Sequence, residues 1–412
     1  MKLLVLSDTF PPFNLGGAGE VAQLVAQGLA RRGHEVLVVT GVTRPRDAGR
    51  ACADGYAIRR IWTPVPPALR LHLALLHPLA VAQVRRIAAA FRPDAVHAHN
   101  LHERLSFAAL AAARTGSQPA IMTAHDYLLF CLTKFLCSQG NVGYTARPWQ
   151  CAHCRHIRRV PGRNAFVHRL VRRHVARLVC ISEAQRGALR ANGYADVPLE
   201  VIYNGIDPDA VRATESDGLA FRARHQLDGR PLVLFGGRTS GAKGGDQLLR
   251  AMAHARQRVD CQLAILGDRP AYFEHAWRLA GQIGLDQQSL HPLGWLDEAE
   301  LRCAFAAANV CATPSVYPDP FNLMTLRAMA QAKPVVGTCY GATPEIVIDG
   351  VTGYIADPWQ PEQFGERLAD VLLDPALARR LGEAGRVRVQ QSFTLERQVS
   401  AYAALLEQAL RG

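Results

Sequence analysis

The sequence contains no uninterrupted apolar stretch of the roughly 18 to 20 residues that a helix needs to cross a bilayer, although 49% of its 412 residues are hydrophobic. The N-terminal segment MKLLVLSDTF leads directly into a motif and shows no cleavage site of the secretory type. We therefore expect a soluble, cytoplasmic protein. Without secretory features, we expect the ten cysteines to be reduced, buried or metal-bound rather than paired in disulfides.

Acidic residues are missing from residues 127–182, whereas arginines crowd the middle of that stretch and the whole chain carries a net charge of +12. A helix over 163–177 is expected to carry Phe166, Leu170 and Val171 among its arginines, the pattern of a segment that lies on a membrane surface. Two interpretations stay open: peripheral contact with the anionic inner face of a membrane, or a solvated basic face. Nucleic acid is disfavoured because no recognition module accompanies the charge. The arginines are Arg155, Arg158, Arg159, Arg163, Arg169, Arg172, Arg173 and Arg177.

Short apolar runs rich in Val, Ile and Leu alternate with helical patterns along the whole chain. Such runs, each followed by a helix, predict parallel strands with both faces covered, so the fold class is α/β. The series runs through 2–8, 34–41, 94–99, a helix near 103–115, then 119–126, 176–182 and 199–207, and it restarts at 231–238. The length suits two domains of about 200 residues each. We expect doubly wound domains at 1–205 and 206–385, followed by a C-terminal helical segment at 386–412.

The first loop, residues 8–20, leads from a predicted strand into a predicted helix. At such a turn, backbone N–H groups and the positive end of the helix attract phosphate, and glycines allow close approach. Many such turns have no ligand and serve the turn alone. The dinucleotide fingerprint G-x-G-x-x-G with a downstream acid is not matched, which disfavours an oxidoreductase or epimerase. The loop contains Pro11, Pro12, Gly16, Gly17 and Gly19.

Two further turns follow strands in the second domain. In GGRTSGAKGGD, Arg238 and Lys243 stand five residues apart at the entry of a helix, which suits a diphosphate. In PSVYPDPFNLMTLRAMA, a helix is expected to begin at about Phe321, so that its first amides point toward a ligand. The amides concerned belong to Asn322, Leu323 and Met324.

These motifs, taken in order, resemble the GT4 family of glycosyltransferases over nearly the whole chain. The resemblance rests on NLGGAGE at 14–20, His125 in TAHD, NGID at 204–207, Arg238 followed by Lys243, and Gly267-Asp268 at a strand end. It implies the GT-B fold, in which two Rossmann-like domains face each other across a cleft and the final helix packs back toward the first domain.

The resemblance also implies a function and a set of roles. A UDP- or GDP-sugar would bind mainly to the second domain and a saccharide or lipid-linked glycan to the first, and the sugar would be transferred with retention at the anomeric carbon. Arg238, Lys243 and helix-end amides would stabilise the departing diphosphate without a divalent metal. His125 would contact the donor sugar or orient the acceptor, and Gly16 and Gly17 would approach the donor.

One position departs from the family pattern. The family's donor motif carries two glutamates eight residues apart, the first near the sugar and the second near the ribose hydroxyls. Here Asp319 and Arg327 occupy those positions. Asp319 keeps the charge on a shorter arm, whereas Arg327 replaces a hydrogen-bond acceptor with a pure donor. A catalytically silent homologue that binds glycan or nucleotide therefore stays open as an alternative.

Four cysteines gather in one loop of the first domain: Cys131, Cys137, Cys151 and Cys154. A Cys-x-x-Cys pair preceded by two further cysteines has the form of a tetrahedral zinc site, although the uneven spacing is not that of a standard zinc finger. Two interpretations stay open, a structural zinc ion or unpaired thiols in a long loop.

Overall fold

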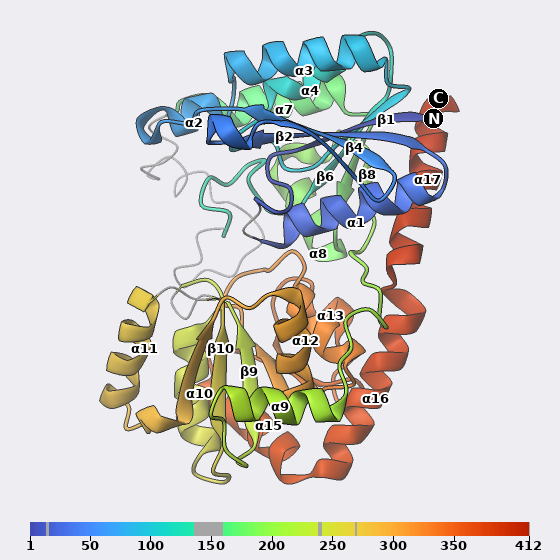
Figure 1. Cartoon of the computed structure of the whole chain (residues 1–412). Coiled ribbons are helices and arrows are strands. Elements are labelled where there is room, and N and C mark those ends of the chain that lie inside the picture. Colours follow the sequence, from blue (N-terminus) through green and yellow to red (C-terminus); the bar gives the residue numbers. More distant parts are fainter. Residues whose placement is uncertain (14–15, 136–159, 238–240, 268–269, 412) are drawn as a thin grey trace. The chain divides into compact units, whose positions relative to one another are not determined.

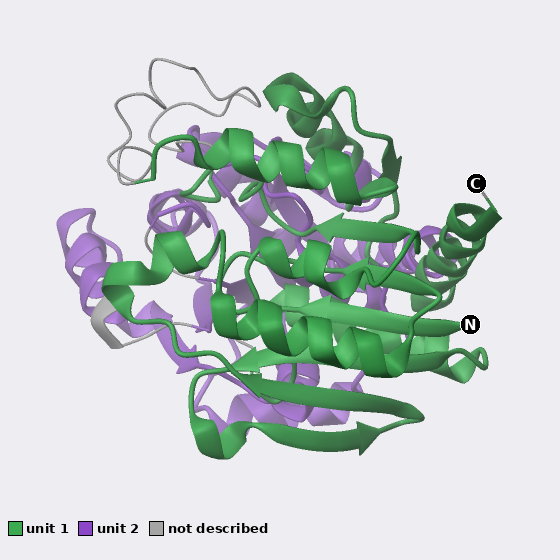
Figure 2. Ribbon diagram, turned by 90° about the horizontal axis from the view of Figure 1, so that it is seen from above, with its two compact units in different colours: residues 1–136, 143–204, 395–412 green, residues 137–142, 205–394 purple. Residues whose placement is uncertain are grey.

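The computed structural model describes residues 1–412 except 14–15, 136–159, 238–240, 268–269 and 412 (Figure 1). The chain divides into two compact units, coloured separately in Figure 2. The first unit comprises the described residues up to Asn204 together with the segment from Leu395 onward, and the second comprises the described residues of Gly205–Thr394. The sequence analysis placed the corresponding boundaries after residues 205 and 385.

The described part of the first unit contains an eight-stranded sheet in the order β3-β4-β2-β1-β5-β6-β7-β8. Its strands are parallel except for β3, which forms an antiparallel hairpin with β4 at the edge. The chain therefore proceeds outward in opposite directions from the β1–β5 pair, which is the topological switch point of this sheet. The strands are β1 (Lys2–Ser7), β2 (Glu35–Val42), β3 (Gly49–Ala53), β4 (Tyr56–Trp62), β5 (Ala95–Ala98), β6 (Ala120–Ala124), β7 (Arg177–Cys180) and β8 (Leu199–Val201).

Helices cover both faces of this sheet, and Figure 1 shows α3 and α4 on one face and α1 on the other. Strands β1, β5 and β6 are buried almost throughout, as continuous apolar runs predict for covered parallel strands. The helices are α1 (Gly17–Arg31), η1 (Pro45–Asp47), η2 (Pro67–Leu69), α2 (Arg70–Leu73), α3 (Pro78–Phe91), α4 (Ala108–Ala113), α7 (Arg163–His174), α8 (Glu183–Leu189), η3 (Arg190–Tyr194) and α17 (Leu395–Arg411).

The described part of the second unit contains a six-stranded, fully parallel sheet in the order β11-β10-β9-β12-β13-β14. This is the doubly wound order, with its switch point between β9 and β12. The strands are β9 (Leu232–Gly236), β10 (Gln262–Leu266), β11 (Leu290–Gly294), β12 (Val310–Thr313), β13 (Val335–Thr338) and β14 (Tyr354–Ala356). The helices are α9 (Glu215–Arg224), α10 (Gly245–Ala255), α11 (Pro270–Gln282), η4 (Gln287–Ser289), α12 (Glu298–Ala307), α13 (Leu323–Ala330), α14 (Thr343–Ile346), α15 (Pro361–Leu373) and α16 (Pro375–Ser392).

The last helix, α17, belongs to the first unit although the whole second unit precedes it in the chain. It packs on α1, where Gly28 leaves room for Val399: a Cβ at Gly28 would lie 2.4 Å from a Val399 methyl carbon. Buried Tyr402 also reaches the first sheet, because its hydroxyl lies 3.0 Å from the Thr123 hydroxyl. The segment expected at 386–412 as one helix therefore comprises the end of α16 and all of α17.

Two further findings concern the helices of the first unit. The helix expected near 103–115 is shorter and begins at Ala108, because the amides of residues 102–105 bind a buried carboxylate described below.

In the described part of the chain, no single helix is long and apolar enough to cross a membrane. The pair Pro67–Leu73 and Pro78–Phe91 meets that test together by length and composition, but it is bent by 47°.

Candidate active site

The carboxyl ends of three neighbouring strands in the second unit finish in glycines with left-handed backbone. Gly237, Gly267 and Gly294 have φ values of 147°, 80° and 70°. Their backbone groups link the strand ends: the Gly237 amide donates to Leu266 at 3.1 Å and the Gly267 amide donates to Gly294 at 2.6 Å. Ligands of open α/β sheets bind at this edge, and glycine lets them approach the backbone.

Lys243 and Asp319 meet at the switch point of the second sheet, since one follows β9 and the other follows β12. Their side chains form a short ion pair in which the Asp319 side chain is 4% exposed and the Lys243 side chain 32%. Ser315 also contacts the carboxylate, at 3.3 Å. The loops touch directly, because a Cβ on Gly244 would lie 1.8 Å from the carbonyl oxygen of Pro314. The structure thus brings together two residues that the sequence assigned to the donor site.

The turn before α13 is arranged differently from the expectation. The helix begins at Leu323, and Asn322 caps it by accepting the Met324 amide at 3.0 Å. The Met324 amide is held by this cap in the structure, and its contact with a ligand stays a prediction. Phe321 is buried with its ring 6.2 Å from that of Phe393, so its side chain is part of the core. Leu323 stays partly exposed.

Arg327 pairs with an acid that the motifs did not identify. Its Nη1 donates to Oε1 of Glu298, the first residue of α12, at 2.6 Å. The Arg327 side chain is 6% exposed and that of Glu298 is 56% exposed. A buried cation thus holds an accessible carboxylate next to the carboxyl end of β11. Arg238 and Asp268 lie outside the described residues.

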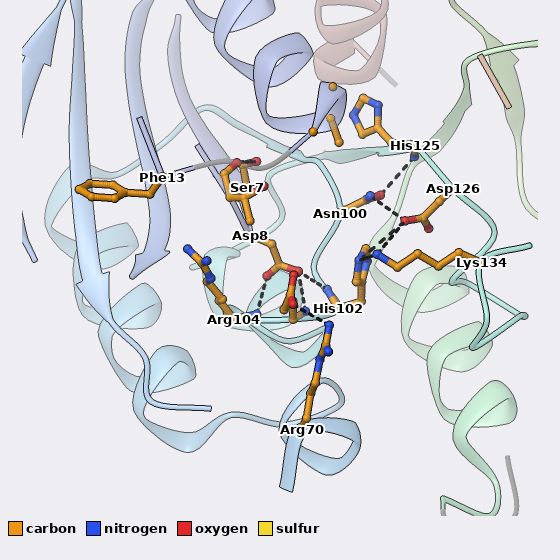
Figure 3. Close-up of a pocket in the computed structure, with 15 residues that line it drawn as sticks. Ser7, Asp8, Phe13, Arg70, Asn100, His102, Arg104, His125, Asp126 and Lys134 are labelled. Atoms are coloured by element: carbon orange, nitrogen blue, oxygen red, sulfur yellow. Dashed lines mark hydrogen bonds and ion pairs between the residues drawn. The ribbon is translucent and has the colours of Figure 1, made fainter. Parts of the chain in front are cut away.

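The first unit has its own cavity, of about 400 Å³, at the carboxyl ends of its central strands (Figure 3). Gly16 and Gly17, which the sequence assigned to the donor, line this cavity at the start of α1. Histidine, carboxylate and cationic side chains share the remaining wall. The full lining is Ser7, Asp8, Thr9, Phe13, Gly16, Gly17, Ala18, Arg70, Asn100, His102, Glu103, Arg104, His125, Asp126 and Lys134.

Asp8, at the carboxyl end of β1, organises the loop after β5. Its carboxylate accepts four backbone amides, those of residues 102 and 103 at 2.5 and 2.6 Å and those of residues 104 and 105 at 3.0 and 2.8 Å. Burial raises the pKa of Asp8 to about 6, although these amides act in the opposite direction. Figure 3 shows the loop wrapped around this carboxylate. The sequence analysis did not single out Asp8.

His125 lies at the carboxyl end of β6, as expected, and its partly buried ring is paired with the fully buried ring of His99. Its Nε2 lies 2.8 Å from Nδ1 of His99, so one ring donates to the other. Burial lowers the pKa of His125 to about 4 and that of His99 well below its usual range. Both rings are therefore neutral near pH 7. Among the described residues, no hydrogen-bond partner is found for Nδ1 of His125.

A second polar chain continues from this pair toward α17. The ring of His97 is tilted by 38° to those of His99 and Tyr402, and its centroid lies 4.2 Å and 4.8 Å from theirs. Its Nε2 lies 2.9 Å from the Thr123 hydroxyl, which in turn contacts Tyr402. Burial lowers the pKa of His97 to about 3. These contacts connect the wall of the cavity to the C-terminal helix.

Asn100 links the ends of two strands at the wall of the cavity. Its side-chain oxygen accepts the His125 amide at 3.2 Å and its Nδ2 donates to Asp126 at 3.1 Å. Lys134 approaches the same Asp126 carboxylate at 3.8 Å and lies 3.3 Å from Nε2 of His102. Burial raises the pKa of Asp126. The cavity therefore offers both donors and acceptors for a polyhydroxylated ligand.

Two sequence features lie partly outside the described residues. Cys137, Cys151 and Cys154 belong to the undescribed segment 136–159, while Cys131 is buried with its sulfur 3.1 Å from the Thr133 hydroxyl. Within the described ranges, no cluster of three or more His, Cys, Asp or Glu side chains has the arrangement to hold a metal ion.

The basic helix α7 ends at His174, earlier than expected, and only part of it is a solvated basic face. Arg169, Arg172 and Arg173 are exposed, together with Phe166. Val171 is fully buried, and Arg163 is 3% exposed because it donates to the carbonyl groups of the loop after β6.

Comparisons with known proteins agree with this architecture. The model of Glycosyltransferase Family 4 matches residues 15–210, and that of Glycosyl transferases group 1 matches residues 219–388. The chain is 30% identical to alpha-maltose-1-phosphate synthase of Mycobacterium tuberculosis, over 96% of each chain. It is 33% identical to the GDP-mannose-dependent alpha-(1-6)-phosphatidylinositol monomannoside mannosyltransferase of Mycolicibacterium smegmatis, over 46% of this chain and 50% of that protein.

Two solved structures share the fold. Sucrose-phosphate synthase from Thermosynechococcus elongatus has a TM-score of 0.79 at 22% identity, covering 99% of this chain and 98% of its own. Anabaena Alr3699/HepE in complex with UDP has a TM-score of 0.72 at 22% identity, covering 99% of this chain and 100% of its own. The two doubly wound units thus define a glycosyltransferase of the GT-B fold. The chain belongs to the GT4-like glycosyltransferases, the group 1 glycosyl transferases.

Proposed function

We propose that the protein transfers a sugar from a UDP- or GDP-sugar to a saccharide or lipid-linked glycan, with retention of the anomeric configuration. The Lys243–Asp319 pair at the switch point of the second sheet carries this proposal, because it places a cation and a carboxylate where a sugar diphosphate would need both. The names of two relatives support the donor class, since one is GDP-mannose-dependent and one structure holds UDP.

The main role of the second unit would be to stabilise the negative charge on the leaving diphosphate. Lys243 lies at the entry of α10 and, with Arg238, would neutralise the charge that grows as the glycosidic bond breaks. Asp319, held by Lys243 and Ser315, would accept hydrogen bonds from sugar hydroxyls. No divalent metal is required in this scheme. No side chain is assigned as nucleophile, because a donor phosphate oxygen can take the acceptor proton while attack proceeds on the same face.

The cavity of the first unit would receive the acceptor. Its neutral imidazole at His125 and its carboxylates suit hydroxyl groups, which donate and accept at once. His125, whose Nδ1 has no hydrogen-bond partner among the described residues, would contact the donor sugar or orient the acceptor.

A titration panel tests the donor assignment. Calorimetry with UDP, GDP and ADP is expected to show binding of UDP or GDP, and NMR of the transfer product is expected to show the donor's anomeric configuration. Preference for ADP contradicts the nucleotide assignment, and an inverted product contradicts retention. Nucleotide binding without turnover of any donor supports the alternative of a catalytically silent homologue. The reason to consider this alternative is that Arg327 stands where the family has a glutamate.

We also propose a structural zinc site at Cys131, Cys137, Cys151 and Cys154, separate from catalysis. Metal analysis is expected to give about one zinc per chain, and serine at Cys151 and Cys154 is expected to remove it and destabilise the first unit. Chelator is expected to stop transfer only where it also lowers the melting temperature. A folded, metal-free preparation contradicts the site.

Peripheral contact with an anionic membrane is proposed for the exposed face of α7. Arg169, Arg172 and Arg173 border a shallow hollow there, and Phe166 is 41% exposed beside them. Charge reversal at the three arginines is expected to abolish sedimentation with vesicles containing phosphatidylserine and to leave neutral vesicles unaffected. Equal sedimentation of the variant and the parent protein contradicts the contact.

A further inference from the structure

We infer that Glu298 is the carboxylate that accepts hydrogen bonds from the vicinal hydroxyls of the donor's ribose, and that Arg327 positions it. This inference rests on the proposed nucleotide-sugar donor and identifies a residue that the sequence motifs do not include. It transfers the diol-binding role from α13, where the sequence placed it, to the first turn of α12.

The geometry of the ion pair makes Glu298 an oriented acceptor. Arg327 approaches one of its oxygens, Oε1, at 2.6 Å, from a side chain that is 6% exposed. A carboxylate has two oxygens and about four lone-pair positions, so this contact leaves acceptor capacity on a group that is 56% exposed. The guanidinium of Arg327 has no acceptor capacity, because it only donates hydrogen bonds. Of the two partners, only Glu298 is able to receive two hydroxyl donors.

The place of Glu298 in the sheet is that of a ligand residue. It follows β11 by four residues, and the carboxyl end of β11 is joined to that of β10 through the Gly267–Gly294 backbone contact. In doubly wound sheets, an acidic side chain at this edge commonly binds ribose hydroxyls. The same edge carries Lys243 at the end of the next strand, β9, where the diphosphate would lie.

An exposed aromatic side chain precedes this carboxylate by three residues in the chain. Trp295 is 69% exposed, although large aromatic side chains are usually buried. Its ring lies 3.6 Å from the position of a Cβ on Gly267, so it covers the glycine end of β10. Residues 295–298 thus offer an exposed aromatic ring, on which a base could stack, and a carboxylate that could accept hydrogen bonds from ribose hydroxyls. A nucleoside-binding site requires both features.

The competing explanation is that Glu298 only neutralises a buried arginine. The two explanations differ in what happens when the ribose hydroxyls are removed from the ligand. We therefore propose calorimetric titration of UDP, GDP and their 2′,3′-dideoxy forms into the parent protein, into Glu298→Gln and into Glu300→Gln. Glutamine keeps an oxygen for Arg327, and Glu300 is a matched control because it lies on the same helix and pairs with Arg224 instead.

The parent protein and Glu300→Gln are expected to bind the ribose form about tenfold or more tightly than the dideoxy form. Glu298→Gln is expected to lose most of that ratio by weakening the ribose form alone, with the Kd of the dideoxy form unchanged. Equal loss for both forms assigns Glu298 a structural role and overturns the inference, as does an unchanged ratio. Absence of nucleotide binding by the parent protein overturns the proposed function and the inference together. Nucleotide binding that does not depend on Glu298 in the expected way overturns the inference alone, so the two failures are distinguishable.

An exchange of the two charges provides a second variant. Arg327→Glu alone places a carboxylate against Glu298 and is expected to weaken both ligand forms. Combined with Glu298→Arg, it restores the ion pair with the acid on α13, and the preference for ribose over dideoxyribose is expected to return at least partly. If the single substitution Arg327→Glu instead strengthens binding of the ribose forms, the acceptor belongs on α13 and Glu298 is not the diol ligand.

Discussion

The two switch points of the molecule have the same strand topology but opposite electrostatic designs. In the first unit, a buried carboxylate, Asp8, gathers four backbone amides, and the imidazoles at His99 and His125 are neutral. In the second unit, cations hold carboxylates, as Lys243 does for Asp319 and Arg327 for Glu298. The fold thus supplies an edge at which ligands bind, while the residues on its loops decide whether that edge suits hydroxyl groups or a diphosphate.

The largest expected effect comes from removing the organising carboxylate of the first unit. Asp8→Ala leaves four amides without their acceptor in a buried loop, so we expect the free energy of unfolding to fall by about 3 kcal/mol or more. Chemical denaturation measures this change, with Asp54→Ala, at the exposed turn between β3 and β4, as a control. A melting curve like that of the parent protein contradicts the organising role.

The next effect concerns the cationic design of the second unit. Lys243→Gln keeps a hydrogen-bond donor for Asp319 but removes the charge, so kcat/KM for the donor is expected to fall by one to two orders of magnitude, as loss of about 1.5 to 3 kcal/mol implies. Steady-state kinetics measures the loss, and Arg258→Gln, in an exposed pair with Asp370, is the matched control. Unchanged kinetics in Lys243→Gln removes the diphosphate role.

The pH dependence of stability separates the two designs further. The native pKa of Asp8, about 6, lies above the ordinary value of 3.8, so the folded protein holds the proton more tightly in that range. Its contribution to the free energy of unfolding is therefore complete below pH 4 and is lost as the pH rises to about 6, by about 3 kcal/mol for a shift of about two units. The difference between the parent protein and Asp8→Asn, measured by denaturation from pH 4 to 7, is expected to show this slope. A constant difference contradicts it.

The smallest effect is an expected absence of change. Because burial lowers the pKa of His125 to about 4, its ring does not titrate between pH 5.5 and 8.5. The kcat/KM profile of His125→Gln is therefore expected to have the same shape over this range as that of the parent protein, at a lower level. Loss of an ionisation near pH 6.5 in the variant would assign His125 a proton-transfer role.

The parallel strands of the two sheets were predictable because each covered strand is a continuous apolar run, as in Leu232–Gly236. The β3–β4 hairpin was missed although its turn, Asp54-Gly55, has the sequence and the positive φ values, 46° and 87°, of a tight hairpin turn. The sequence therefore held a local signal that the helix and strand pattern alone does not use.

Long-range partners were not predictable from the sequence. The helix expected near 103–115 begins at Ala108 because its preceding amides bind Asp8, which lies more than 90 residues away in the chain. Arg327 was identified as unusual from its motif, but its partner Glu298 belongs to no motif. Likewise, a histidine at the end of a strand is visible in the sequence, whereas its contact with His99 depends on the strand order.

The chain order of α17 has a consequence for synthesis. A ribosome makes the whole of the second unit, residues 205–394, before it makes the helix that completes the first. Until then, α1 lacks the neighbour that fills the space over Gly28, and Thr123 lacks the hydroxyl of Tyr402. The unit that begins the chain is thus finished after the second, so a chain that stops after residue 394 would contain a complete second unit and an incomplete first.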